Sequence, residues 1–320
     1  MKMTEKLPKL AIVVPCYYEE EVLPKTLKVI GGLLKDMIKQ KEISGESVVC
    51  LVNDGSKDKT WQIIQKAAAK DKNIFGISLS RNFGNHKEII AGMYECDADI
   101  YVTIDADLQD DCCAIREMLK KIKDGCDIVY GVRDSRDTDT IFKKYSALAF
   151  YKLMKLLGVN IVYNHADFRM MTRRAVNSLK EFPERNLFLR ALVPLVGFKY
   201  DKVYYDRKAR EAGETKYPLM KMLGFAWSGI SSFSIVPLRL VTFTGFAVCF
   251  LSLIFMMYLL YGWAHGKTLV GWASLVTVIT VFSGVQLLSL GVIGEYMAKI
   301  FIEVKHRPLY IIDEKTTPAK

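Results

Sequence analysis

The sequence predicts an α/β domain with a mostly parallel sheet, followed by two membrane-spanning helices. Short apolar runs alternate with amphipathic segments through residues 10–132, which is typical of a parallel sheet covered by helices on both faces. Residues 240–264 and 269–294 contain no charged side chain, and each run exceeds the roughly 20 residues that cross a bilayer as a helix. The 320 residues are enough for both parts.

The elements of the first part are expected in strict alternation. Strands are expected at residues 10–14, 47–52, 74–79, 100–104 and 127–132. Helices are expected at residues 19–39, 61–69, 86–96 and 114–123. A strand-like segment returns at 163–171, and further amphipathic helices are expected at 141–157 and 218–232.

Polar residues follow each predicted strand where the strand ends. They are Pro15 to Glu20, Asp54, Arg81-Asn82, the pair Asp105 and Asp107, and Arg133. Parallel strands bring their carboxyl ends to one edge of a sheet, and ligands bind there. The pattern therefore predicts a ligand site at this edge. No Gly-x-Gly-x-x-Gly or P-loop motif occurs, so a bound diphosphate would have to be held by side chains and a metal.

The stretch from Tyr101 to Asp110 contains the candidate metal ligands. Asp105 and Asp107 stand two residues apart after an apolar run, and at strand spacing such residues share a face. Hard divalent cations such as Mg²⁺ bind one or two carboxylates and complete their shell with substrate phosphates. A lone Asp-x-Asp is also common in solvated turns; the motifs at the other strand ends favour the metal site.

The two uncharged runs are expected to form a hairpin, because only residues 265–268 join them. Buried core helices are the alternative. Basic residues flank the hairpin at Lys216, Lys221, Arg239, Lys299, Lys305 and Arg307. By the positive-inside rule, this charge predicts a multi-pass protein of the inner membrane. The large N-terminal domain, which would be catalytic, and both termini are expected in the cytoplasm. The expected boundaries are 1–217 for the cytosolic domain, 218–234 for a juxtamembrane helix, 235–300 for spans at about 238–264 and 269–294, and 301–320 for a tail.

The charge and the cysteines limit the partners. The net charge of +10 would suit nucleic acid, anionic lipid or a phosphorylated substrate, and the membrane spans favour the last two over nucleic acid. The seven cysteines lack Cys-x-x-Cys spacing, which indicates reduced thiols without a zinc site or disulfide frame. Gly284, Gly291 and Gly294 suit close helix contact, either within the hairpin or in a homo-oligomer.

Six motifs, taken in order, resemble those of family 2 glycosyltransferases with the GT-A fold. They are Val14-Pro-Cys-Tyr-Tyr-Glu-Glu20, Val52-Asn-Asp-Gly-Ser-Lys-Asp58, Ser80-Arg-Asn-Phe-Gly-Asn85, Asp105-Ala-Asp-Leu-Gln-Asp110, His165-Ala-Asp-Phe-Arg169 and Arg210-Glu-Ala-Gly-Glu-Thr-Lys-Tyr217. With two spans behind them, the chain is most similar to polyprenyl-phosphate glycosyltransferases, the group of bactoprenol glucosyltransferases and dolichol-phosphate mannose synthases. The resemblance reaches to about residue 308.

The resemblance implies a role for individual residues. Pro15, Tyr17, Glu19, Asp54 and Arg81 match positions around the nucleoside of a nucleotide-sugar donor. Asp105 and Asp107 match ligands of Mg²⁺ or Mn²⁺, with Gln109 beside them, and Arg207, Arg210 and Lys216 match a loop that closes over the diphosphate. Arg133, Lys143, Lys144 and Ser146 match the site for the acceptor phosphate. Tyr18, Asn53 and Cys112-Cys113 depart from the common pattern without touching the metal pair.

Asp167 matches the residue usually assigned as catalytic base. A phosphate monoester has a second pKa near ~6 and is already largely ionised at cytosolic pH. Asp167 is therefore expected either to take a proton or only to orient the nucleophile. The alternative is a structural pair with Arg169.

The resemblance implies an inverting enzyme that moves a hexosyl unit to undecaprenyl phosphate, with UDP-glucose as the expected donor. UDP-GlcNAc, UDP-galactose and GDP-mannose are alternatives, since the motifs identify the diphosphate better than the sugar. A processive polysaccharide synthase is disfavoured because no Gln-x-x-Arg-Trp motif occurs. From another class, a non-catalytic membrane scaffold would not need the carboxylates that this chain retains.

Overall fold

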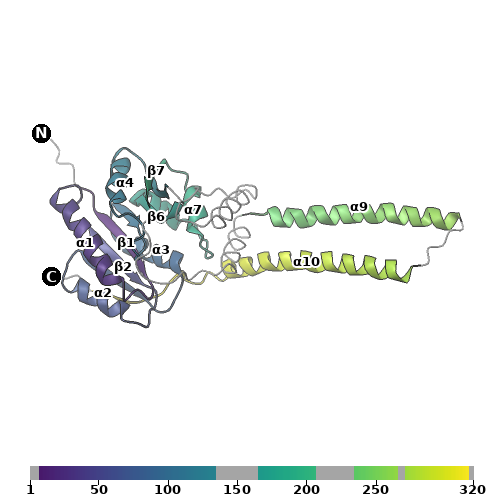
Figure 1. Cartoon of the computed structure of the whole chain (residues 1–320), viewed down its shortest axis with the longest axis horizontal. Coiled ribbons are helices and arrows are strands. Elements are labelled where there is room, and N and C mark those ends of the chain that lie inside the picture. Colours follow the sequence, from purple (N-terminus) through teal and green to yellow (C-terminus); the bar gives the residue numbers. More distant parts are fainter. Residues whose placement is uncertain (1–6, 135–164, 207–233, 266–270, 317–320) are drawn as a thin grey trace. The chain divides into compact units, whose positions relative to one another are not determined.

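The structure is a computed structural model that describes residues 7–134, 165–206, 234–265 and 271–316 (Figure 1). The chain forms two compact units. One unit combines the N-terminal domain with the C-terminal residues from Arg307 onward, and the other contains the two long apolar helices.

In the described residues, eight strands form one mixed sheet, in the order β7-β5-β6-β4-β1-β2-β3-β8. The strands are β1 (Leu10–Cys16), β2 (Val48–Asn53), β3 (Ile74–Leu79), β4 (Ile100–Thr103), β5 (Ile128–Arg133), β6 (His165–Thr172), β7 (Tyr200–Tyr205) and β8 (Ile312–Lys315). The helices are α1 (Leu23–Lys39), α2 (Thr60–Ala68), α3 (Asn85–Glu95), α4 (Ala114–Lys123), α6 (Arg173–Lys180) and α7 (Leu189–Leu195). β6 and β8 run antiparallel to their neighbours, and the other pairs are parallel. The predicted α/β fold with a mostly parallel sheet is confirmed.

The centre of the sheet is built by continuous apolar strands. β1 is buried along its whole length between β4 and β2, as expected of a strand covered on both faces. Helix α3 packs unusually close to β1, because Gly92 has no side chain: a Cβ there would lie 2.3 Å from a methyl group of Val13. This close approach brings the N-terminal half of α3 to the carboxyl end of β1.

β6 brings a distant segment to the same edge of the sheet. It lies between β4 and β5 and is antiparallel to both, with Arg169 opposite Thr103 and His165 opposite Val132. Because its direction is reversed, its first residues, including Asp167, meet the carboxyl ends of β4 and β5. The predicted strand at 163–171 is present, but the sequence pattern did not indicate its direction.

The C-terminal residues differ from the expected separate tail at 301–320. They end in β8, which pairs antiparallel with β3 and covers an edge that would otherwise leave its backbone unpaired. Glu314 accepts hydrogen bonds from Trp61 Nε1 at 2.9 Å and Gln65 Nε2 at 2.9 Å. The backbone N–H of Ser80 also donates to the carbonyl of Ile311 at 3.0 Å. The segment Ile312–Lys315 is therefore part of the sheet.

The second unit contains α9 (Val236–Ala264) and α10 (Trp272–Val304). In the described residues, the stretches Val236–Gly262 and Val278–Val304 are long and apolar enough to cross a membrane. Both stretches are unburied, and Phe243 and Leu288 are each 74% exposed, which is not how the core helices of a globule behave. α10 continues ten residues past the predicted end at 294. The predicted helices at 141–157 and 218–232 lie outside the described residues.

Candidate active site

The Asp105–Asp110 loop directly follows β4 at the carboxyl edge of the sheet. The side chain of Thr26, fully buried in α1, donates a hydrogen bond of 2.6 Å to the carbonyl of Ala106, between the two aspartates. Further along, the backbone N–H of Gln109 donates to Asp107 Oδ1 at 3.2 Å. Leu108 has a φ of 54°, in the left-handed region that a bulky side chain rarely adopts. The loop is thus held in one conformation by contacts on both sides.

The charge in this loop is strongly negative. Burial raises the pKa of Asp105 to about 7, the neighbouring charges of Asp110, Asp167 and Asp107 act in the same direction, and Arg133 opposes them. Carboxylates that repel one another in this way are stabilised by a cation placed among them. The loop therefore has the electrostatics of a metal site.

Asp110 supplies a further sign that a positive group belongs here. Its side chain is buried, and Oδ1 accepts hydrogen bonds from the Tyr205 hydroxyl at 2.6 Å and from Arg133 Nη2 at 3.4 Å. Its Oδ2 is also buried and has no hydrogen-bond partner among the described residues. Among all the residues that the structure describes, no three His, Cys, Asp or Glu side chains are arranged to hold a metal by themselves. The pair Asp105 and Asp107 fits a cation whose other ligands are substrate oxygens.

The predicted nucleoside loop follows β1 and is fixed through backbone contacts. Tyr17 and Tyr18 are partly exposed, and their rings lie edge to face with centroids 4.6 Å apart. The backbone N–H of Glu19 donates to Thr60 Oγ1 at 3.1 Å, and Pro15 lies inside β1, opposite Val52. Two exposed aromatic rings beside a sheet edge offer a stacking surface for a base.

Asp54 supports the neighbouring loop. Its two carboxylate oxygens accept hydrogen bonds from the backbone N–H groups of Phe83 at 2.7 Å and Gly84 at 2.8 Å. The guanidinium of Arg81 stacks on the Phe83 ring, 4.2 Å from its centroid. Asp54 thus fixes the backbone of the loop after β3, and with it the position of the Phe83 ring on which Arg81 stacks. Its predicted contact with a base or ribose stays a prediction.

Glu88 was not identified from the sequence. It is buried in the first turn of α3 and accepts a hydrogen bond from the backbone N–H of Cys16. Burial, followed by the charge of Asp54, raises the pKa of Glu88 well above its usual value. Its only sequence signal is an acidic residue in the first turn of a helix, which is too common a feature to mark a site.

Asp167 is held between two arginines. Its Oδ1 lies 2.6 Å from Arg169 Nη2, and its Oδ2 lies 3.1 Å from Arg190 Nη2. Burial alone would raise the pKa of Asp167, but the charges of Arg190 and Arg169 hold it far below its usual value. A carboxylate with so low a pKa is a weak proton acceptor. Of the roles expected for Asp167, orientation and structural pairing fit this geometry better than base catalysis.

Comparison with known proteins assigns the family. The family model for "Glycosyl transferase family 2" matches residues 11–180, which include β1 to β6 and both the Asp105 and Asp167 segments. The chain belongs to glycosyltransferase family 2. Together with the mixed, mostly parallel sheet, this membership confirms the predicted GT-A fold and shows that the protein is an enzyme that transfers glycosyl groups.

Several relatives of this family 2 glycosyltransferase are similar along nearly their whole length. The Bacillus subtilis "Uncharacterized glycosyltransferase YkoT" is 48% identical over 97% of this chain and 93% of the relative. The "Bactoprenol glucosyl transferase" of Shigella phage SfV is 38% identical over 95% and 98%. The Escherichia coli "Prophage bactoprenol glucosyl transferase homolog" is 37% identical over 95% and 98%. Among solved structures, glucosyl-3-phosphoglycerate synthase from Mycobacterium tuberculosis is 13% identical over 70% of this chain and 76% of that chain, with a TM-score of 0.47.

The remaining site residues of this glycosyltransferase divide into two groups. Arg133, predicted at the acceptor phosphate, ends β5 and pairs with Asp110, so it lies close to the metal loop, and its acceptor role stays a prediction. Six predicted residues lie outside the described part of the chain: Lys143, Lys144, Ser146, Arg207, Arg210 and Lys216.

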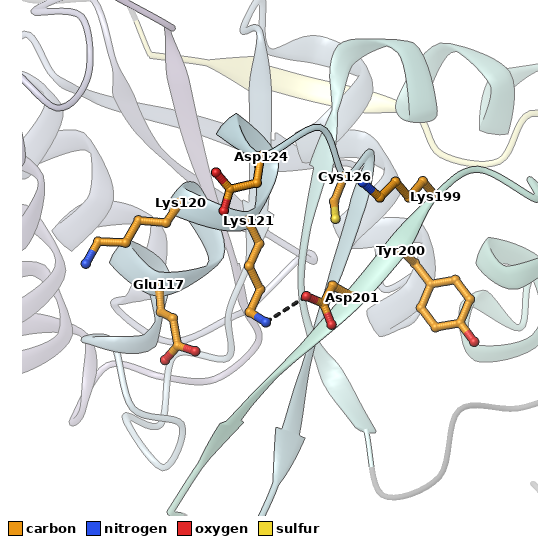
Figure 2. A pocket seen from close by; sticks show the side chains of 8 residues that line it. All are labelled: Glu117, Lys120, Lys121, Asp124, Cys126, Lys199, Tyr200 and Asp201. Atoms are coloured by element: carbon orange, nitrogen blue, oxygen red, sulfur yellow. Dashed lines mark hydrogen bonds and ion pairs between the residues drawn. The ribbon is translucent and has the colours of Figure 1, made fainter.

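A separate hollow of about 400 Å³ lies away from these residues (Figure 2). It is lined by the C-terminal end of α4 and the first residues of β7, where Lys121 Nζ lies 2.7 Å from Asp201 Oδ2. The hollow lies at the amino ends of β5 and β7, which are at the edge of the sheet opposite Asp105. The hollow therefore does not belong to the candidate site.

Proposed function

We propose that the enzyme transfers a glucosyl unit from UDP-glucose to undecaprenyl phosphate at the inner leaflet, with inversion, to give a β-linked lipid-phosphate sugar. The similarity to bactoprenol glucosyl transferases over nearly the whole chain carries this proposal. The two long apolar helices support it, because a lipid acceptor requires an enzyme at the membrane. The proposed arrangement places the N-terminal domain and both termini in the cytoplasm.

The proposal assigns Asp105 and Asp107 to a Mg²⁺ or Mn²⁺ ion. When bound, this ion would neutralise the donor diphosphate as negative charge develops on it. Asp110, Tyr205 and Arg133 would hold the surrounding loop, and Thr26 would fix the carbonyl between the two ligands. Gln109 and the loop of Pro15, Tyr17 and Glu19 are proposed to lie against the donor.

The acceptor chemistry agrees with the low pKa of Asp167. Because the second pKa of a phosphate monoester is near ~6, the nucleophile arrives already ionised and needs no strong base. Asp167 would then orient groups around the acceptor. It would not need to remove a proton, because the phosphate has already lost its proton to the solvent. This assignment explains why a carboxylate between two arginines can stand at a reaction centre.

The test uses the full chain purified in detergent, undecaprenyl phosphate and radiolabelled UDP-glucose, UDP-GlcNAc, UDP-galactose or GDP-mannose, each with Mn²⁺, Mg²⁺ or EDTA. We expect organic-phase label with UDP-glucose and a divalent ion, no label with EDTA, and about 100-fold less label in Asp105→Asn. Organic-phase label with another donor would support the proposed reaction but show that a different sugar is transferred. No label with any donor would overturn the proposed lipid acceptor.

A further inference from the structure

The two arginines beside Asp167 are not equivalent. Arg169 stands on β6 and is 1% exposed, whereas the side chain of Arg190, in the first turn of α7, is 39% exposed. Arg169 also donates from Nη1 to the carbonyl of Leu189 at 3.2 Å, which ties it into the core. Arg169 is therefore the buried counter-ion of Asp167, while the side chain of Arg190 is partly exposed.

The backbone around Arg190 is fixed from two directions. His86 Nδ1 lies 2.9 Å from the carbonyl of Leu187, and Arg169 holds the carbonyl of Leu189. Asp167 then holds the guanidinium itself at 3.1 Å. A cation oriented in this way loses little side-chain entropy when it binds an anion.

The two arginines lie next to the metal loop. Asp167 contacts the guanidiniums of both Arg169 and Arg190. Thr103, the last residue of β4, donates a hydrogen bond from Oγ1 to the carbonyl of Asp167, and the loop of Asp105 follows β4. The edge of the sheet thus carries carboxylates that can bind a cation and, next to them, guanidiniums that can bind an anion.

We propose that Arg190 binds the phosphate of the acceptor, with Asp167 as the residue that positions it. The inference rests on the proposed function, in which that acceptor is a polyprenyl phosphate. A phosphate oxygen could also come from the donor, but the donor diphosphate has the cation at Asp105 and Asp107 to neutralise it. The acceptor phosphate has no such ion and needs a fixed guanidinium, which matches phosphate oxygens in a bidentate geometry.

The test compares Arg190→Gln and Arg190→Lys in the full chain in detergent, with Arg174→Gln as control. Arg174 is an exposed arginine 3.8 Å from Asp127, at the amino end of β5. Direct binding of farnesyl phosphate and of UDP with Mn²⁺ is measured by calorimetry, together with KM for acceptor and donor. We expect Arg190→Gln to weaken farnesyl phosphate binding and raise the acceptor KM by about tenfold or more, the scale of one lost charged hydrogen bond. UDP binding should stay within about twofold, and Arg190→Lys should recover part of the loss.

The outcomes separate this inference from the proposed function. If the natural chain binds farnesyl phosphate and Arg190→Gln binds it equally well, the inference is overturned and the proposed acceptor stands. If Arg190→Gln weakens UDP and farnesyl phosphate equally, Arg190 serves the donor or the fold, and the inference also fails. If the natural chain binds no lipid phosphate, both the inference on Arg190 and the proposed function are overturned. Should Arg190→Gln not fold, Arg190→Lys alone decides, by the same ratio of acceptor to UDP affinity.

Discussion

Asp105 and Asp167 lie at the same edge of one sheet, yet their surroundings act on them in opposite directions. Burial, together with the charges of Asp110, Asp167 and Asp107, raises the pKa of Asp105 to about 7, and Arg133 acts in the opposite direction. Two guanidiniums contact Asp167 and hold its pKa far below the usual value. The surroundings of Asp105 disfavour its negative charge, whereas those of Asp167 favour it. The difference supports the proposal that the first carboxylate binds a metal and that the second orients charged partners.

The largest expected effect is on the metal side of this comparison. Asp105→Asn should lower turnover by about 100-fold or more, the scale for losing a main source of transition-state charge stabilisation. Mn²⁺ binding, followed by electron paramagnetic resonance, should weaken in parallel, while the melting temperature without metal stays the same or rises because repulsion is relieved. Asp124→Asn, an exposed change at the opposite edge, is the control. Equal Mn²⁺ affinity in both variants would contradict the metal assignment.

On the arginine side, the expected effect is on stability. Asp167→Asn would leave the buried guanidinium of Arg169 without its charge partner, and breaking a buried pair in this way costs about 3–5 kcal/mol. The free energy of unfolding of the full chain in detergent measures the loss. In Asp201→Asn the partner is lost from the exposed pair with Lys121, and the cost should be below about 1 kcal/mol. Similar losses in the two variants would remove the distinction between Asp167 and a surface ion pair.

A pH series without metal sharpens the comparison further. Asp105 titrates near 7 in the folded chain and near its usual 3.8 when unfolded, so between these values the folded chain holds a proton that the unfolded chain has released. The contribution of Asp105 to stability therefore falls as pH rises from about 4 to 7. The difference in melting temperature between the natural chain and Asp105→Asn, measured across this range, isolates the effect. It should shrink in saturating Mn²⁺, and a flat difference without metal would show that Asp105 has an ordinary pKa.

The smallest expected effect tests how the metal loop is held. Thr26→Val removes the hydroxyl that donates to the Ala106 carbonyl and should cost about 1–2 kcal/mol of stability, because a buried carbonyl loses its donor. Since that carbonyl lies between Asp105 and Asp107, Mn²⁺ affinity should fall a few-fold. Thr26→Ser keeps the hydroxyl and should bind Mn²⁺ like the natural chain. If Thr26→Val has no effect on Mn²⁺ affinity, the loop does not depend on α1 for its shape.

The metal loop could be predicted from local sequence because its signal is local. Asp105 and Asp107 are two residues apart and directly follow an apolar strand, so spacing alone brings them together at a sheet edge. The surroundings of Asp167 are different. Arg190 is 23 residues away, on a helix that the apolar pattern did not reveal, and only the reversed direction of β6 brings the two together. Glu88 and Thr26 were missed for the same reason, since each acts through a contact with a distant loop.

The sequence by itself determined the alternating α/β pattern, the carboxylate pair and the two long apolar helices, because each depends on residues that are neighbours along the chain. Tertiary structure decided which charges meet, since pairing of strands far apart in sequence brings Asp110 to Tyr205 and Asp167 to Arg190. It also decided that Ile312–Lys315 forms an edge strand beside β3. A pKa depends on distances through space, and those distances are fixed only when the sheet has formed.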